Sequence, residues 1–378
     1  MNARGPAYGW RQPLDMEWDG NMKPAIKAKK LRPADFKAIF AFFETAEVDY
    51  PALRSMISRR FEGNNILLTL CNAFVDNMES IEAGNGAVMS MQPMIAKSVL
   101  SLIITVGRIR AAKIFLEAGV ERWDKERFRE VHAMLMLLGE EIERLDAIDR
   151  PWLDYQVYDR GHKTTMILFC GLADRFGVEM NAVIPWLRSL PVNLVYIRDF
   201  NRLLYLAGIQ SLGNLEETIS ALKRDLAAIG TERTITMGNS GGVYGCLYYA
   251  DLLKADGVLC FAGPTSLKAG VDEASERPVY ERVQELVDKG ELVEPDLRQL
   301  FLGNGIPVRY FFGQDYQFDL TQSETFQDLP NVSIEGLQNW ERHIVIGEMA
   351  RRNQLTTVLA DAADVTLKGL NRAGTLVS

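Results

Sequence analysis

Short apolar runs alternate with amphipathic helical stretches in the second half of the chain, and this alternation restricts the fold more than any other feature. A strand formed by such a run would be buried on both faces, as in parallel sheets covered by helices. The expected strands are Thr165–Cys170, Val192–Arg198, Thr234–Met237, Gly257–Phe261, Val308–Phe312 and Val332–Gly336. Helices are expected between them, at 180–189, 214–229, 242–254, 277–302, 321–328 and 344–353. The pattern predicts an α/β domain with a doubly wound, mostly parallel sheet.

The first half of the chain has a different pattern, which predicts an all-helical domain. Residues 1–32 contain Gly, Pro and Trp without a period and are expected to form an extended arm. Apolar residues then recur at helical spacing, and helices are expected at 33–45, 50–61, 64–83, 93–118 and 124–146. We therefore expect an arm and helical domain over 1–155, followed by the α/β domain over 156–378.

The composition narrows the class of protein. The 378 residues carry a net charge of −8, which argues against a nucleic-acid-binding protein, because such proteins usually have a basic face. The start of the chain lacks the apolar region of a secretory signal, and the longest apolar helical stretch, 99–106, is too short to cross a bilayer. A cytoplasmic protein without a membrane span is expected. The cysteines predict reduced core thiols rather than disulfides or a zinc site, because they are far apart within apolar runs: Cys71, Cys170, Cys246 and Cys260.

The most specific motif is Gly238-Asn-Ser240-Gly-Gly242, a Gly-x-Ser-x-Gly sequence between an expected strand and an expected helix. A turn this tight would hold the serine in a strained conformation, and the flanking glycines would remove side chains that collide with it. Gly245 is expected to let the helix approach the sheet. Ser240 would stand at a helix N-terminus, where developing negative charge is stabilised. The alternative is a turn that only packs or binds phosphate, but no Gly-Lys-Ser/Thr or Gly-x-Gly-x-x-Gly pattern supports the latter.

A base for this serine can be sought by elimination, because the chain has only three histidines. His132 lies inside an expected helix, and His162 precedes the first expected strand. Ligand chemistry in parallel sheets lies at the opposite edge, where the strands end. His343 follows the last strand and is therefore the predicted base, with a surface histidine at a helix start as the alternative.

The acid of a triad should follow the preceding strand, and two aspartates do so. Asp315 is nearer to the strand end, but it could be a free loop carboxylate. Asp319 could instead cap a helix that begins at Leu320, with Gln322 completing a capping box. Either aspartate gives the order Ser, Asp, His along the chain.

An oxyanion in such a site needs two backbone donors. The first expected donor is the N–H of Gly241, directly after the serine. The second is expected in the loop after strand Thr165–Cys170, from Leu172 or Ala173. No cofactor or metal site stands out in the sequence.

Polar residues after the second strand also fall beside this edge. Arg198, Asp199 and Arg202 are candidates to bind an anionic group of the substrate, and an internal Asp–Arg pair is the alternative. Residues 264–306 separate two strands and contain amphipathic helical patterns. They would form either a lid over the pocket or an enlarged connection.

With these residues in view, the chain over 160–355 resembles the α/β-hydrolase superfamily. The resemblance rests on Gly-Asn-Ser-Gly-Gly, on the Tyr-Gly-Cys-Leu-Tyr-Tyr-Ala-Asp stretch that follows it, and on the late aspartate and histidine. More narrowly, it is similar to small α/β-hydrolase-like domains of bacterial proteins that are attached to helical or repeat modules. That resemblance implies an aspartate that opens the helix after the penultimate strand, which matches Asp319.

These features lead us to expect a serine hydrolase that cleaves a carboxylic ester or thioester of a small-molecule acyl substrate through an acyl-enzyme on Ser240. The helical domain is expected to offer a surface for a protein or carrier partner. One alternative is an acyltransferase that uses the same triad. Another is a non-catalytic binding or scaffold protein with a hydrolase-like fold, in which Ser240 and His343 would be beyond hydrogen-bond reach.

Overall fold

The computed structural model describes residues 31–364 apart from 46, 89, 124–125, 137–148 and 271–276. Within this part the N-terminal region is all-helical, as the sequence predicts. Its helices are α2 (Pro33–Phe43), α3 (Tyr50–Arg60), α4 (Asn65–Glu82), α5 (Pro93–Thr105), α6 (Ile109–Trp123) and α7 (Glu126–Met136). Residues 1–30 of the expected arm and 137–146 of the last expected helix lie outside the described residues.

Local sequence explains where these helices begin and end. The side chain of Asp49 accepts a hydrogen bond from the N–H of Ala52 at the start of α3. The single helix expected at 93–118 is wrong, because the structure has two helices there. Gly107 separates them with a φ of +74°, a left-handed conformation that commonly ends a helix at glycine.

The second half forms a seven-stranded sheet with the order β1-β3-β2-β4-β5-β6-β7. Strand β1 pairs antiparallel with β3, and every other neighbouring pair is parallel. The six strands expected from the sequence are present, and β1 is an additional edge strand. The strands are β1 (Tyr155–Tyr158), β2 (Thr164–Phe169), β3 (Val192–Ile197), β4 (Arg233–Asn239), β5 (Gly257–Phe261), β6 (Val308–Gly313) and β7 (Val332–Leu337).

Helices connect the strands in the expected alternation, with three differences. The stretch 277–302 is two helices, since Gly290 turns the chain with a φ of +72°. The helix expected at 321 begins earlier, at Gln317, and the last helix is not expected from the sequence. The helices are α8 (Met180–Arg188), α9 (Leu215–Ala228), α10 (Gly242–Leu253), α11 (Arg277–Asp288), α12 (Leu297–Asn304), α13 (Gln317–Glu324), α14 (Ile346–Arg351) and α15 (Leu355–Ala362).

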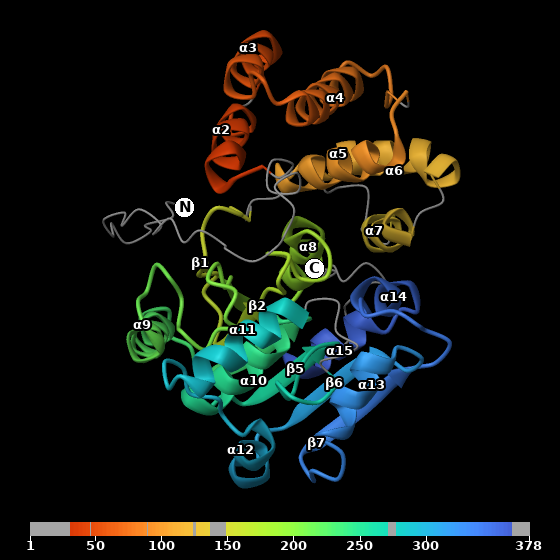
Figure 1. The fold of residues 1–378 in the computed structure, drawn as a ribbon. Helices are drawn as coiled ribbons and strands as arrows, with labels where there is room; N and C mark the ends of the chain where they lie inside the picture. The colour runs from red at the N-terminus through yellow and green to blue at the C-terminus, as the bar shows by residue number, and fades with distance from the viewer. Residues whose placement is uncertain are drawn as a thin grey trace.

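Each face of the sheet has its own hydrophobic cluster. Along β2 the buried side chains alternate between them, as the two-residue period of a strand requires. Met166 and Leu168 belong to one cluster, and Ile167 and Phe169 belong to the other. The sheet is therefore the middle layer of the molecule, with α8, α14 and α15 on one side and α9 to α13 on the other (Figure 1).

One of these clusters continues without interruption into the N-terminal helices. Val131 of α7 and Ile346 and Met349 of α14 belong to the same cluster as Met166 in the sheet. Helices α8 and α14 lie between the sheet and the helices α5 to α7 (Figure 1). The helical region thus rests directly on the layer that covers one face of the sheet.

Candidate active site

Ser240 occupies a strained turn between β4 and α10. Its φ is +52°, in the left-handed region that side chains other than glycine rarely adopt. A Cβ atom on Gly238 would lie 2.5 Å from the carbonyl oxygen of Gly242, and one on Gly242 would overlap the carbonyl oxygen of Phe169. The glycines on both sides of the serine are therefore required by the close packing of the turn, as the sequence predicts.

The role expected for Gly245 needs correction. A Cβ atom on this residue would lie 2.5 Å from the ring of Tyr205, which belongs to the loop after β3. Gly245 therefore makes room for a buried tyrosine, and Gly242 is the residue that lets α10 approach the end of β2. The Tyr205 hydroxyl donates to the carbonyl of Cys170 at 2.6 Å and lies 3.1 Å from that of Ile197.

Three side chains from separate segments meet at this turn. The Nε2 atom of His343 lies 2.8 Å from the Oγ atom of Ser240. Its Nδ1 atom lies 2.8 Å and 3.1 Å from the two carboxylate oxygens of Asp319. The serine follows β4, the aspartate lies in the first turn of α13 after β6, and the histidine follows β7. All three reach the edge where the parallel strands end.

The structure distinguishes the two candidate aspartates. Asp319 is fully buried against the imidazole, whereas Asp315 is exposed on the loop before α13. The alternative role of Asp319 as a helix cap is excluded, because α13 begins at Gln317 and Asp319 lies within its first turn. Gln322 instead accepts hydrogen bonds from the backbone N–H groups of Thr265 and Ser266, at 2.8 and 2.9 Å.

The acid and the histidine of the triad differ in their exposure to solvent, since Asp319 is fully buried and His343 is partly exposed. Burial raises the pKa of Asp319 above its ordinary value, and the nearby His343 opposes the shift. The side chain of His343 is 24% exposed, so solvent reaches part of the imidazole. The rings of Tyr316 and Phe318 flank the imidazole, with centroids 5.7 and 6.2 Å from its own.

The loop after β2 lies directly beside the serine. A Cβ atom on Gly171 would lie 3.0 Å from the Cβ atom of Ser240. A Cβ atom on Gly241 would lie 2.8 Å from the Cγ atom of Leu172, so the Leu172 side chain covers the residue after the serine. Ala173 is exposed on the same loop. The expected donors Gly241 and Leu172 therefore belong to two segments in contact.

The substrate-binding role expected for the residues after β3 needs correction. Arg198 is fully buried, and its guanidinium contacts both carboxylate oxygens of Asp149, at 2.7 and 2.6 Å. Asp199 is also buried and accepts hydrogen bonds from the N–H groups of Leu203 and Tyr205, at 2.7 and 2.9 Å. The guanidinium of Arg198 and the Oδ2 of Asp199 are thus occupied by the protein itself, whereas the Oδ1 of Asp199 is buried without a hydrogen-bond partner among the described residues.

The remaining candidate, Arg202, pairs with Asp174 at 2.5 Å. An internal Asp–Arg pair, the alternative that the sequence left open, is thus present twice, with Asp149 and Asp174 as the acids. Burial alone would lower the pKa of Arg198, but the adjacent Asp149 raises it above its ordinary value. Burial raises the pKa of Asp199, and the two backbone hydrogen bonds partly offset the shift.

The segment 264–306 packs as helices over the sheet in its described part. Helix α12 lies against α10, and Val279 and Val283 of α11 are buried in the cluster on that face. The Tyr280 ring contacts the ring of Phe318 at a centroid distance of 6.1 Å. Phe318 in turn flanks the imidazole, so α11 borders the site through one aromatic residue.

The described residues contain neither a metal-binding cluster nor a membrane-spanning helix. No group of three or more His, Cys, Asp and Glu side chains there could hold a metal ion. None of the helices in that part of the chain combines the length and apolar character that a bilayer crossing needs. The cysteines are free and buried.

The residues that shape the loop beside Ser240 have no direct signal in the sequence. Tyr205 contacts the carbonyl of Cys170, and Asp149 acts through Arg198, so both residues reach this loop from other segments of the chain. From the sequence, Gly245 predicts only a close approach of the helix to the sheet, and it does not identify Tyr205 as the group that fills the space. Such contacts depend on tertiary packing, which has no local pattern in the sequence.

No protein-family model and no curated protein matches the chain. Solved structures are similar to part of the chain. The chain is similar to the esterase Pf2001 of Pyrococcus furiosus, with 14% identity, a TM-score of 0.40, and coverage of 56% of this chain and 86% of that one. It is similar to MGS-MChE2, an α/β-hydrolase enzyme from a lagoon-sediment metagenome, with 18% identity, a TM-score of 0.38, and coverage of 56% and 95%. For MenH of S. aureus the values are 12%, 0.39, 56% and 99%.

The fold itself is decided by the topology. An antiparallel edge strand is followed by six parallel strands in the order β3-β2-β4-β5-β6-β7, with a Gly-x-Ser-x-Gly turn between a central strand and its helix. An acidic residue after β6 and a histidine after β7 complete the chain order Ser, Asp, His. The second half of this chain has an α/β-hydrolase fold.

Proposed function

We propose that this protein is a serine hydrolase that cleaves carboxylic esters or thioesters through an acyl-enzyme on Ser240. The observation that carries the proposal is the continuous hydrogen-bonded series from Ser240 through His343 to Asp319, with 2.8 Å at each step. A serine hydroxyl is a weak nucleophile, and a base at this distance can take its proton as it attacks. The strained turn adds support, because strain of this kind is concentrated at functional sites.

The chemistry follows from the roles of the three side chains. The Oγ atom of Ser240 forms a bond to the acyl carbon while the Nε2 atom of His343 takes its proton. The buried carboxylate of Asp319 holds the Nδ1–H and stabilises the imidazolium that forms. The imidazolium then gives its proton to the departing alcohol or thiol, and the acyl-enzyme remains. A water molecule repeats the sequence, which releases the acid and restores Ser240.

The negative oxygen of the tetrahedral intermediate requires donors that are already in position. The N–H groups of Gly241 and Leu172 suit this role, because Gly241 begins the turn into α10 and Leu172 packs over it. Loss of one such donor typically raises the barrier by about 3 kcal/mol. Leu172 is preferred over Ala173 because only the former covers the residue after the serine.

Hydrolysis is favoured over acyl transfer by the exposure of the site. The imidazole is 24% exposed at the edge of the sheet, so water can reach the acyl-enzyme. A non-catalytic binding protein with this fold is disfavoured by the position of Ser240. Binding alone does not require a strained serine whose Oγ lies 2.8 Å from the Nε2 of a histidine. The substrate is proposed to be a small-molecule ester or thioester.

The proposal is tested by labelling with a fluorophosphonate probe, which reacts with an activated serine. We expect the wild type to be labelled and Ser240→Ala not to be labelled. Ser333→Ala is the matched control, because it removes an exposed serine hydroxyl from β7 and should keep wild-type labelling. Folded wild-type protein without Ser240-dependent labelling would rule out the hydrolase function.

A further inference from the structure

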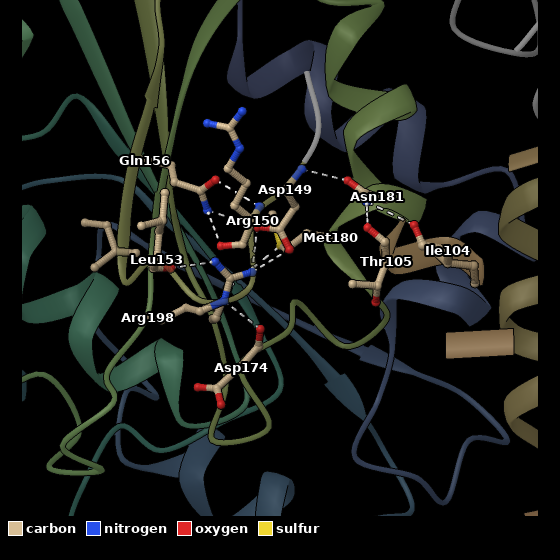
Figure 2. A network of polar contacts seen from close by, with 12 residues as sticks. Ile104, Thr105, Asp149, Arg150, Leu153, Gln156, Asp174, Met180, Asn181 and Arg198 are labelled. Carbon is tan, nitrogen blue, oxygen red and sulfur yellow. Dashed lines mark hydrogen bonds and ion pairs between the residues drawn. The ribbon is translucent and has the colours of Figure 1, made fainter. Parts of the chain in front are cut away.

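A buried polar network lies where the helical region meets the sheet (Figure 2). Its centre is Arg198, which follows β3 and has no exposed side-chain surface. The two oxygens of Asp149 occupy one side of the guanidinium, and the Nε2 of Gln156 on β1 donates to Asp149 at 3.0 Å. A charged group this deep needs partners on every side, because burying an unpaired charge is costly.

One contact of Arg198 reaches the loop beside Ser240. Its Nε donates to the backbone carbonyl of Asp174 at 2.9 Å. Asp174 has a φ of +59°, and its N–H donates to the carbonyl of Gly171 at 2.9 Å. The turn is closed by a bond from the N–H of Gly171 to the carbonyl of Arg175, also 2.9 Å. Leu172 lies within this closed turn, so the direction of its N–H depends on where Asp174 is held.

The opposite side of the network reaches the helical region. The N–H of Asp149 donates to the Oδ1 of Asn181 at 2.9 Å. The Nδ2 of Asn181 donates to the carbonyls of Ile104 and Thr105, at 2.9 and 2.8 Å. These carbonyls belong to the last turn of α5, where a helix leaves acceptors without partners within the helix. Asn181 thus connects the end of α5 to the acid that holds Arg198.

A second connection runs in parallel. The hydroxyl of Ser101 on α5 donates to Glu179 at 2.9 Å, and Glu179 lies 3.4 Å from the guanidinium of Arg175. Arg175 closes the turn that contains Leu172. Helix α5 therefore reaches the C-terminal end of this turn by two routes, through Asp174 and through Arg175.

We propose that Arg198 is a positioning residue that sets the oxyanion donor of Leu172, and that α5 holds Arg198 in place through Asn181 and Asp149. This inference rests on the proposed hydrolase function. If this inference holds, the helical region contributes to the hydrolase site, because the carbonyls of Ile104 and Thr105 at the end of α5 set the position of an oxyanion donor. Lysine could not replace Arg198, because only the planar guanidinium reaches Asp149 and the Asp174 carbonyl together.

The first test is Asn181→Ala, with Asn193→Ala as the matched control. Asn193 is also buried, and its hydrogen-bond partners lie near the start of β2, away from Ser240. Its Oδ1 accepts from the N–H groups of Arg160 and His162, at 2.9 and 3.1 Å, and its Nδ2 donates to the carbonyl of His162 and the hydroxyl of Thr165, at 2.7 and 3.4 Å. It lies near the start of β3, at the opposite edge of the sheet. Both variants should lose stability to a similar extent.

The readout is kcat and KM for p-nitrophenyl butyrate, together with the thermal midpoint of each folded variant. We expect Asn181→Ala to lower kcat by about tenfold with little change in KM, because a displaced donor weakens the transition state and not the bound ester. Asn193→Ala should keep wild-type kcat. Equal kcat values for the two variants would overturn the positioning role.

A second variant removes the ion pair without leaving a buried charge. Asp149→Leu with Arg198→Met replaces both partners by apolar side chains, which proteins often tolerate better than the loss of one partner. We expect a folded protein whose kcat is lower by about 100-fold, the size of effect that a displaced catalytic group produces. Wild-type kcat in this folded double variant would equally overturn the proposal.

Hydrogen exchange separates this inference from the proposed function. Backbone amides of 170–176 should exchange faster in Asn181→Ala than in Asn193→Ala, while those of 239–246 should not differ. If the wild type shows no Ser240-dependent labelling, the hydrolase function fails, whatever the exchange data show. If the wild type is labelled but 170–176 exchange equally in both variants, only the positioning role fails.

Discussion

The two sides of Ser240 are held by different means. On the acid–base side, His343 contacts Ser240 and Asp319 directly, and all three residues follow strands of one sheet. On the proposed oxyanion side, the turn that contains Leu172 is connected through Arg198, Asp149 and Asn181 to the end of a helix outside that sheet. The difference teaches that a site can have one half specified by its own fold and the other half by an added region.

The sharpest way to test the acid–base side is Asp319→Asn beside Asp315→Asn. The amide at 319 would hold the wrong tautomer of His343, and kcat should fall by about 10⁴-fold, as in other triads that lose the acid. Asp315 is exposed on the loop before α13, so its variant should retain wild-type kcat. Steady-state kinetics measure both. A comparable loss in the two variants would mean that the contact between Asp319 and His343 has no catalytic role.

The oxyanion side is tested by removing one backbone donor at a time with proline. Leu172→Pro should lower kcat by about 100-fold or more, because a proline has no N–H to offer the oxyanion. Ala173→Pro is the matched control on the same turn, at an exposed position. Kinetics should be read with thermal midpoints, so that a misfolded turn is recognised. The opposite order of effects would assign the donor to Ala173.

The smallest expected effect concerns Glu348, which lies on α14 after the histidine loop. Burial acts to raise the pKa of Glu348, but the guanidinium groups of Arg351 and Arg352 outweigh it and hold the pKa below its ordinary value of 4.5. The carboxylate therefore adds stability that is present above the unfolded-state pKa and lost as the pH falls through the folded-state pKa.

Glu348→Gln should thus lower the free energy of unfolding by about 1 kcal/mol at neutral pH, a value reduced because Arg351 is largely exposed. The difference from the wild type should shrink as the pH falls below 4.5. Glu285→Gln, which breaks an exposed pair with Lys289, should have no measurable effect. Urea unfolding at several pH values measures all three proteins. A deficit that stays constant with pH would show that the charge of Glu348 is not involved.

Much of the fold could be predicted from the sequence because the β-α alternation and the Gly-x-Ser-x-Gly motif are local patterns. Strand β1 was missed because Tyr155–Tyr158 is a short edge strand without a long apolar run. Two helices were predicted too long, because a helical apolar period continues across Gly107 and Gly290. The spacing of apolar residues does not show where the backbone turns at a glycine.

The candidate site residues could be predicted from the sequence only where their order along the chain identifies them. His343 could be found by elimination, but Asp315 and Asp319 are separated by one turn of backbone, and only the start of α13 determines which one meets the imidazole. Arg198 was misassigned because strand position alone suggests an exposed edge. Its burial depends on Asp149, which approaches from the segment before β1. Pairings of this kind become visible only once the layers are packed.

The hydrophobic cluster shared by the helical region and the sheet has a practical consequence for anyone who wishes to excise the hydrolase half. A truncated chain that starts at β1 would leave Ile346, Met349 and Val345 without their cover from α7. The truncation would expose an apolar surface on α14, the helix that follows the loop of His343. A chimera that joins this α/β half to another protein would therefore need an apolar surface in place of the lost helices.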